Sequence, residues 1–330
     1  MARHDTLKLL VAGTLNPPST DPDALRAFGA ALAHEVIQCG HTLMGGCMNA
    51  FDTVVAEAAH RALARHGAAP AADGLPRLRS FVLGGQQPAH AFGSVVRSRL
   101  NNWQLDKDAL LVPEQVAQAD AVVLCGGGDG TLVAANWARI AGKPLLPLAA
   151  FGGAAERLYL RELEGFAHPY IPASRYEVLG RLAAQPASLA ADVVQLAEAL
   201  ALPREVAVLM SYADDAGLEA SFSAVRQACH QLGFRADRVD HGNTLGRIVP
   251  AIMHRIEHCA FVVCDLTGLR PNVFYELGFA TGLHKRVVQI AREGTELPFD
   301  VHDHPTLFYR DAEALKRELG ERIALVAQRG

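Results

Sequence analysis

Several classes of protein are excluded by what this chain of 330 residues lacks. No apolar run approaches the roughly 20 residues of a membrane-spanning helix, and the GxSxG motif of serine hydrolases is absent. No dense run of lysine and arginine occurs, and the formal net charge of −4 is small, which argues against a surface that coats nucleic acid. None of the six cysteines belongs to a CxxC motif, which favours buried free thiols in a reducing cytoplasm.

The remaining composition is that of a soluble globular protein with two domains. Hydrophobic residues make up 50% of the chain and charged residues 20%. The opening segment, MARHDTLKLLVAGTLNPPST, has an apolar run that is too short for a signal peptide and that leads into Asn-Pro-Pro. We interpret it as a first strand, and we expect a cytoplasmic protein that binds neither membranes nor nucleic acid.

Short apolar strands alternate with amphipathic helices twice along the chain, which is typical of two α/β units with mostly parallel sheets. For the first unit we predict strands at 7–12, 41–44, 79–83, 120–124 and 144–148, and helices at 22–38, 50–65, 113–118, 130–141 and from 153 onward. For the second we predict strands at 205–211, 234–239, 260–265, 286–290 and 306–309, and helices at 217–232, 244–258, 270–284 and 311–328. Further helical stretches at 173–183 and 187–200 lie between the units. The sequence therefore predicts two Rossmann-like units with helices on both faces of each sheet, the C-terminal one flavodoxin-like.

Four of the predicted strands in the first unit end in glycine-rich turns. Glycine lets backbone amides approach an anion closely, and a helix that follows adds a favourable dipole. Because ligands bind beyond the carboxyl ends of parallel strands, we expect a phosphate-bearing nucleotide there. The predicted binding residues are Gly13, Thr14, Gly45, Gly46, Gly127, Gly128, Asp129, Gly130, Thr131, Gly152 and Gly153. Arg97 and Arg99 could reach the phosphate from the same edge, or could be ordinary surface arginines.

The first unit resembles the SLOG family, which is related to the lonely-guy phosphoribohydrolases and to nucleotide-sensing modules of bacterial immune proteins. The matching stretches are VAGT (11–14), GHTLMGG (40–46), GGDGT (127–131) and GKPLLPL followed by FGG. In the hydrolytic relatives the loop carries a catalytic glutamate, and its position here is occupied by Ala134. The resemblance therefore implies that this unit senses a small nucleotide rather than hydrolyses it.

An alternative interpretation of the GGDGT loop is that of NAD kinases and diacylglycerol kinases. In those enzymes the aspartate of the loop, here Asp129, helps to activate the hydroxyl that accepts the phosphate. The chain carries none of the asparagine–acid sequences that these kinases have further along. We therefore favour nucleotide sensing, which phosphorylation of NAD by ATP would contradict.

The second unit carries its candidate chemistry in CDLTGLRPNVFYELGFATGL, residues 264–283. A predicted strand ends at Asp265, and Asn272 and Glu276 follow one helical turn apart. We expect these three residues to converge on one pocket, with Glu276 ionised under the influence of the helix dipole and Arg270. A lone ionised carboxylate suits attack at the anomeric carbon of a sugar, where the transition state resembles an oxocarbenium ion. The alternative is that Glu276 is an ordinary surface acid and that Asp265 only caps a turn.

Residues 205–310 resemble the nucleoside 2-deoxyribosyltransferase-like group, which is related in fold to TIR-like domains. The resemblance rests on DLTGLRPNVFYELG and on the later LPFDV at 297–301. It implies that Glu276 is the nucleophile, that Asp265 contacts the base, and that Ser211 and Tyr212 bind the sugar. The stretch 270–272, Arg-Pro-Asn, stands where the transferases have an acidic, glycine-rich loop. That change favours a phosphorylated or dinucleotide substrate.

Two histidine pairs have spacings that a metal ion can use. His254 and His258 are four residues apart on a predicted helix that also carries Glu257, and His302 and His304 lie in a predicted loop. The sequence identifies no third ligand for either pair. We therefore favour surface histidines and no metal.

Together these features predict a SLOG-like nucleotide-binding domain at 1–165, a helical connector at 166–203, and a deoxyribosyltransferase-like or TIR-like domain at 204–330. The expected function is that of an N-glycosidase that is regulated by a nucleotide signal and cleaves the ribose–base bond of NAD or a related nucleotide without a cofactor. The family resemblance implies a homo-oligomeric antiviral defence effector. Two alternatives stay open: a nucleotide sensor or scaffold without catalysis, and a nucleoside 2-deoxyribosyltransferase.

Overall fold

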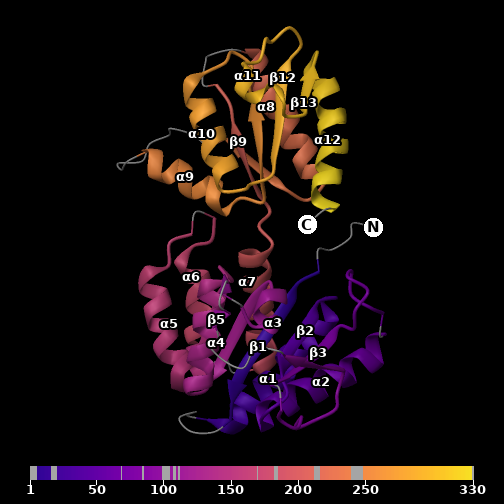
Figure 1. Cartoon of the computed structure of the whole chain (residues 1–330), viewed down its shortest axis with the longest axis vertical. Coiled ribbons are helices and arrows are strands. Elements are labelled where there is room, and N and C mark those ends of the chain that lie inside the picture. Colours follow the sequence, from indigo (N-terminus) through magenta and orange to yellow (C-terminus); the bar gives the residue numbers. More distant parts are fainter. Residues whose placement is uncertain are drawn as a thin grey trace. The chain divides into compact units, whose positions relative to one another are not determined.

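A computed structural model describes residues 6–15, 21–67, 69–83, 85–98, 105–106, 109–110, 112–168, 170–181, 185–211, 216–238 and 248–328. The chain forms two compact units. In Figure 1 the colours of the first unit begin at indigo and those of the second end at yellow. One unit contains the chain up to Ala167 together with Ile171–Leu202. The other contains His168–Tyr170 and the chain from Pro203 onward.

The first unit is built on a six-stranded, all-parallel sheet with the order β4-β3-β2-β1-β7-β8. Its strands are β1 (Lys8–Thr14), β2 (Thr42–Gly46), β3 (Leu78–Leu83), β4 (Ser94–Ser98), β7 (Ala121–Gly126) and β8 (Leu145–Leu148), and a separate antiparallel pair is formed by β5 (Leu105–Asp106) and β6 (Ala109–Leu110). The helical elements are α1 (Pro22–Gln38), α2 (Ala50–His66), α3 (Glu114–Gln118), α4 (Asp129–Ile140), η1 (Ala149–Phe151), α5 (Gly153–Gly165), α6 (Ala173–Tyr176), η2 (Glu177–Gly180) and α7 (Pro186–Ala201).

Helices cover both faces of this sheet because successive side chains of a strand point to opposite sides. Leu9 and Val11 of β1 face the core formed with α1, α2 and α7. Leu10, between them, faces the second core, which contains Trp137 of α4 and Leu158 of α5. The glycines at the ends of β1, β2 and β7 are thereby held at one edge of the sheet, between two packed layers.

The second unit has a five-stranded, all-parallel sheet with the order β10-β9-β11-β12-β13. Its strands are β9 (Glu205–Leu209), β10 (Arg235–Arg238), β11 (Phe261–Asp265), β12 (Val287–Arg292) and β13 (Thr306–Tyr309), and its helices are α8 (Ala216–Gln231), α9 (Ile248–His258), α10 (Pro271–Gly282), α11 (Phe299–His302) and α12 (Ala312–Gln328). Helices α8 and α12 pack on one face, and α9 and α10 pack on the other. This strand order is that of flavodoxin-like folds, in which the order reverses between β9 and β11.

The predicted fold class is therefore confirmed, with differences in detail. The prediction omitted β4, β5, β6, η1 and α11. Strand β4 was missed because it lies at the sheet edge, where Val95 and Arg97 are exposed and the apolar alternation is broken. None of the helices in the described part of the chain is long and apolar enough to cross a bilayer.

Helix α7, which the sequence places in a connector, belongs to the first unit. Leu189, Val193 and Leu196 join the core beneath α1. The Glu198 carboxylate pairs with the buried His41 ring, with 2.7 Å between Oε1 and Nε2. The predicted helix at 187–200 already had an apolar face. Such a face is stabilised by packing against a core, which explains why α7 packs on the first unit.

Candidate functional site

A cavity of about 340 Å³ lies at the carboxyl ends of β1, β2 and β7 in the first unit. The sequence-predicted residues in its lining are Gly13, Thr14, Gly45, Gly46, Gly128, Gly130 and Thr131. The lining also contains residues that the sequence analysis did not select, including Met48, Asn49, Asp52, Gln115 and Trp137. The parallel sheet thus brings three of the four predicted glycine turns to one cavity, whose volume is that of a small-molecule site.

The turn between β7 and α4 depends on glycine geometry. Gly126 and Gly127 have φ angles of 56° and 79°, in the left-handed region that glycine tolerates. A Cβ at Gly127 would lie 1.9 Å from the Thr131 hydroxyl oxygen, so no other residue fits there. Gly128 then begins α4 without a side-chain cap. The first-turn N–H groups of a helix lack intrahelical partners, so this end of α4 suits a ligand anion.

Four predicted residues of the glycine turns lie outside the cavity lining: Gly127, Asp129, Gly152 and Gly153. Gly152 and Gly153 are buried behind the β7–α4 turn, where the Ala154 N–H donates to the Gly127 carbonyl at 2.8 Å. A Cβ at Gly153 would lie 2.7 Å from that same carbonyl oxygen, so Gly153 allows close packing against the turn. Asp129 is exposed and does not line the cavity, an orientation that gives no support to the kinase interpretation.

The predicted arginines do not complete a phosphate site in the described residues. The Arg97 side chain is exposed on β4 and donates to the Gln86 carbonyl at 3.3 Å, and it does not line the cavity. Arg99 lies outside the described residues. Among the described residues, the groups that an anion in this cavity can use are therefore backbone N–H groups and not a guanidinium.

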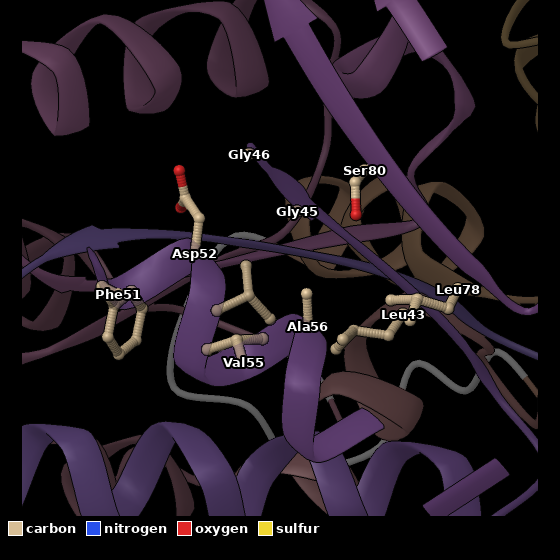
Figure 2. A pocket seen from close by; sticks show the side chains of 10 residues that line it. Leu43, Gly45, Gly46, Phe51, Asp52, Val55, Ala56, Leu78 and Ser80 are labelled. Carbon is tan, nitrogen blue, oxygen red and sulfur yellow. The ribbon is translucent and has the colours of Figure 1, made fainter. Parts of the chain in front are cut away.

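Asp52, which the sequence analysis missed, is the only ionisable residue in the described lining of the cavity. It is 7% exposed, and its Oδ2 accepts the N–H groups of Met48 at 2.9 Å and Asn49 at 3.2 Å. Asp52 and Gly46 also line a smaller hollow of about 10 Å³, whose lining side chains Figure 2 shows. A Cβ at Gly46 would lie 2.5 Å from the Asp52 Oδ2. The sequence shows the Asn-x-x-Asp spacing of this capping box, but it does not show that the Asp52 carboxyl lines a cavity.

Burial raises the pKa of Asp52 from 3.8 to about 6, although its backbone hydrogen bonds act in the opposite direction. The folded state therefore holds this proton more tightly than the unfolded chain does, so stability is lost as pH rises through the interval from about 4 to 6. We expect Asp52→Asn to remove that loss, which amounts to at most about 3 kcal/mol. The measurement is urea unfolding at about pH 4.5 and pH 7, followed by tryptophan fluorescence, since both tryptophans precede residue 168.

The control for this experiment is Asp21→Asn, at the exposed cap of α1, where the aspartate Oδ1 accepts the Ala24 N–H. This variant should retain the wild-type difference between the two pH values. An unchanged pH dependence in Asp52→Asn would show that the Asp52 carboxyl is not a major source of it.

In the second unit, Glu276 lies on α10, which packs over β9, β11 and β12. The residue is only 4% exposed, and among the described residues no hydrogen bond or ion pair reaches its carboxylate. Burial raises its pKa from 4.5 to about 7. The expectation of a carboxylate kept ionised by Arg270 and the helix dipole is therefore wrong, because Arg270 is exposed and desolvation dominates.

Among the described residues, no hydrogen bond joins any two of the three predicted catalytic residues. Asp265 points to the sheet face covered by α8 and α12, where its Oδ2 accepts the Tyr309 hydroxyl at 2.9 Å. Its Oδ1 accepts the Thr267 N–H at 2.9 Å, so both carboxylate oxygens are engaged. Glu276 belongs to the helix layer on the opposite face, and Asn272 is exposed at the start of α10.

The predicted sugar-binding residues lie just after β9. Ser211 is buried there, next to the place where the strand order reverses, and Tyr212 lies outside the described residues. Tyr309 was not predicted. Besides donating to Asp265, its hydroxyl oxygen accepts the Ser221 hydroxyl at 3.0 Å. A strand-ending tyrosine gives no sequence signal for such a network, because its partners lie 44 and 88 residues away.

No protein-family model and no curated protein matches the chain. Among solved structures, TM1055 is similar over 58% of this chain and 99% of its own, with 19% identity and a TM-score of 0.39. The molybdenum cofactor carrier protein from Chlamydomonas reinhardtii is similar over 58% of this chain and 98% of its own, with 19% identity and a TM-score of 0.38. A 2-desoxiribosyltransferase from Leishmania mexicana is similar over 36% of this chain and 98% of its own, with 19% identity and a TM-score of 0.29. At this identity and these TM-scores, the similarities carry no functional information.

Proposed function

We propose that the chain is an N-glycosidase regulated by a nucleotide. The second unit would cleave the bond between ribose and base in NAD or a related nucleotide, and the first would bind a nucleotide signal in its glycine-lined cavity. The observation that carries the proposal is Glu276, a buried carboxyl with a raised pKa on the helix that follows β11, next to the reversal of strand order. Perturbed, buried acids at that place in a sheet are typical of functional sites.

The chemistry requires only one carboxylate when nicotinamide is the leaving group. In its ionised form, Glu276 stabilises the developing oxocarbenium ion or forms a sugar ester at the anomeric carbon. The carbon–nitrogen bond breaks, its electron pair neutralises the pyridinium ring, and water supplies the hydroxyl group of the ribose and one released proton. No acid has to protonate the leaving base. This fits a site in which Asp265 is held by Tyr309 and Thr267.

The regulatory half of the proposal is supported by the cavity in the first unit. Its polar lining combines an uncapped helix start at Gly128 with the amide of Asn49 and the carboxyl of Asp52. Backbone N–H groups suit a phosphate, whereas Asp52 suits a hydroxyl or amino group of the same ligand. Ala134 stands in the lining where a hydrolytic relative would have its glutamate, which favours binding without turnover. An oligomeric defence effector is the biological setting that we propose for this pair of units.

A second candidate is a nucleotide sensor or scaffold that performs no chemistry. The engagement of both Asp265 oxygens, on the face opposite to Glu276, favours it, because the base contact expected of a transferase is then missing. The deciding experiment incubates the full chain with NAD, ATP or deoxynucleosides, with and without cyclic nucleotides, and separates the products by chromatography. Free nicotinamide or adenine supports the glycosidase, exchange of bases supports a deoxyribosyltransferase, and tight binding without products supports the sensor.

A further inference from the structure

A cluster of metal-binding side chains in the second unit shares no residue with the site around Glu276 or with the lining of the glycine-lined cavity. His254, Glu257 and His258 share one face of α9, and their ligand atoms all lie within 4.8 Å of one another. Residues three and four positions apart are neighbours on a helix surface, and two histidines four apart can bind one ion. We propose that these three residues form a site for a divalent transition-metal ion such as Zn²⁺.

The hydrogen bonding of His258 prepares it as a ligand. Its Nδ1 lies 2.8 Å from the His254 carbonyl oxygen, which can only accept, so Nδ1 carries the proton and Nε2 keeps its lone pair. Metal-binding histidines usually fix their second nitrogen in this way, often on a backbone carbonyl. The two rings of the pair lie edge-on with 4.2 Å between their centroids.

Glu257 supplies the negative charge of the site. Its Oε2 lies 3.6 Å from Nδ1 of His254. After a small rotamer change, one metal ion can bind both atoms. Two imidazoles and one carboxylate make a ligand set that zinc accepts, with a remaining position for water. The side chains of His254 and Glu257 are 37% and 59% exposed, so an ion can enter from solvent.

His168 borders the site without being a ligand. Its ring lies edge-on to His258, with 4.9 Å between centroids, and it belongs to the second unit. Its Nδ1 accepts the Tyr170 N–H at 3.2 Å. With its Nδ1 occupied in this way, the ring lies beside the site and is not one of its three ligands.

The test uses the full chain stripped of metal and titrated with Co²⁺, whose visible absorption reports nitrogen and oxygen coordination, followed by displacement with Zn²⁺. We expect one ion per chain, and at least about tenfold weaker binding in His254→Ala and in His258→Ala. Glu257→Gln should also weaken the binding of Co²⁺. Each variant is checked by circular dichroism, and none of the three side chains is fully buried.

Two control variants make the assignment specific. His168→Asn should bind Co²⁺ within about threefold of wild type, because its ring is not a ligand. Removing His302 and His304 together should also leave binding unchanged. Loss of binding in either control, equal binding in His258→Ala, or several weakly bound ions per chain would overturn the proposed site. None of these measurements depends on base release, so they test the metal site independently of the proposed glycosidase activity.

Discussion

Replacing Glu276 by glutamine is expected to abolish the release of nicotinamide from NAD and to leave the second unit folded. Glutamine has nearly the same shape, so it fits the space on α10, but it cannot stabilise a cationic transition state or form a sugar ester. The expected loss in the rate of base release is on the order of a thousandfold or more. In the wild-type chain the rate should rise with pH through about 7, because the carboxylate is the active form and burial raises the pKa of Glu276 to that value.

The same substitution should make the second unit more stable at alkaline pH. The folded-state pKa of Glu276 is raised from 4.5 to about 7, so its contribution to stability is present below about 4.5 and is lost as pH rises to about 7. Glutamine carries no charge, so at pH 8 the variant should gain up to about 3 kcal/mol in the free energy of unfolding. Urea unfolding followed by circular dichroism measures this gain.

These two readouts separate a catalytic role from a structural one. Glu296→Gln, which removes an exposed acid of the same unit, is the control and should alter neither base release nor the pH dependence of stability. Undiminished base release by Glu276→Gln would refute the catalytic role of this residue. A variant that loses activity together with its circular dichroism spectrum would count as a folding defect.

Replacing Gly130 by leucine is expected to block the cavity of the first unit without unfolding it. Gly130 lines the cavity near the start of α4, and an added Cβ would meet no other atom within 4 Å. A leucine side chain there would take up space that a ligand needs. We expect nucleotide affinity to fall by about a hundredfold or more, whereas removal of a helical glycine should itself stabilise α4 by up to about 1 kcal/mol.

The measurement is calorimetric titration with ATP, NAD and cyclic nucleotides, using whichever of them the wild-type chain binds. Gly165→Leu is the matched control, because this glycine ends α5, is exposed, does not line the cavity, and also has no atom within 4 Å of an added Cβ. Affinity equal to wild type in Gly130→Leu would place the nucleotide elsewhere. If base release in the second unit responds to the nucleotide, that response should disappear in this variant and persist in the control.

Periodicity in the sequence was sufficient to predict most of the fold. Helix α1 was predicted near 22–38, because its apolar positions repeat at helical spacing, and it is observed at Pro22–Gln38 with Asp21 as its cap. The glycine turns after β1, β2 and β7 were predicted to meet, and they do, because parallel strands end at one edge. Such features depend on local chemistry and on a rule of topology, both of which a sequence displays.

The predictions that failed depended on which face a side chain occupies and on what surrounds it. Asp265 shares the parity of Phe261 and Val263, so it points toward α8 and α12, but its partner Tyr309 stands 44 residues further along the chain. The raised pKa of Glu276 follows from desolvation, which three-dimensional packing alone determines. Asp52 was visible as a helix cap, but its role in a cavity required the positions of Gly46 and Asn49.

The contribution of α7 to the first core bears on how the chain matures in the cell. Leu189, Val193 and Leu196 are among the last core residues of that unit to be synthesised, and they seal the apolar surface of α1, which was made far earlier. A nascent chain that has not yet passed Ala201 on the ribosome therefore leaves part of α1 without its cover. Chaperone binding and aggregation should be concentrated in that interval of translation, before the first strand of the second unit has left the exit tunnel.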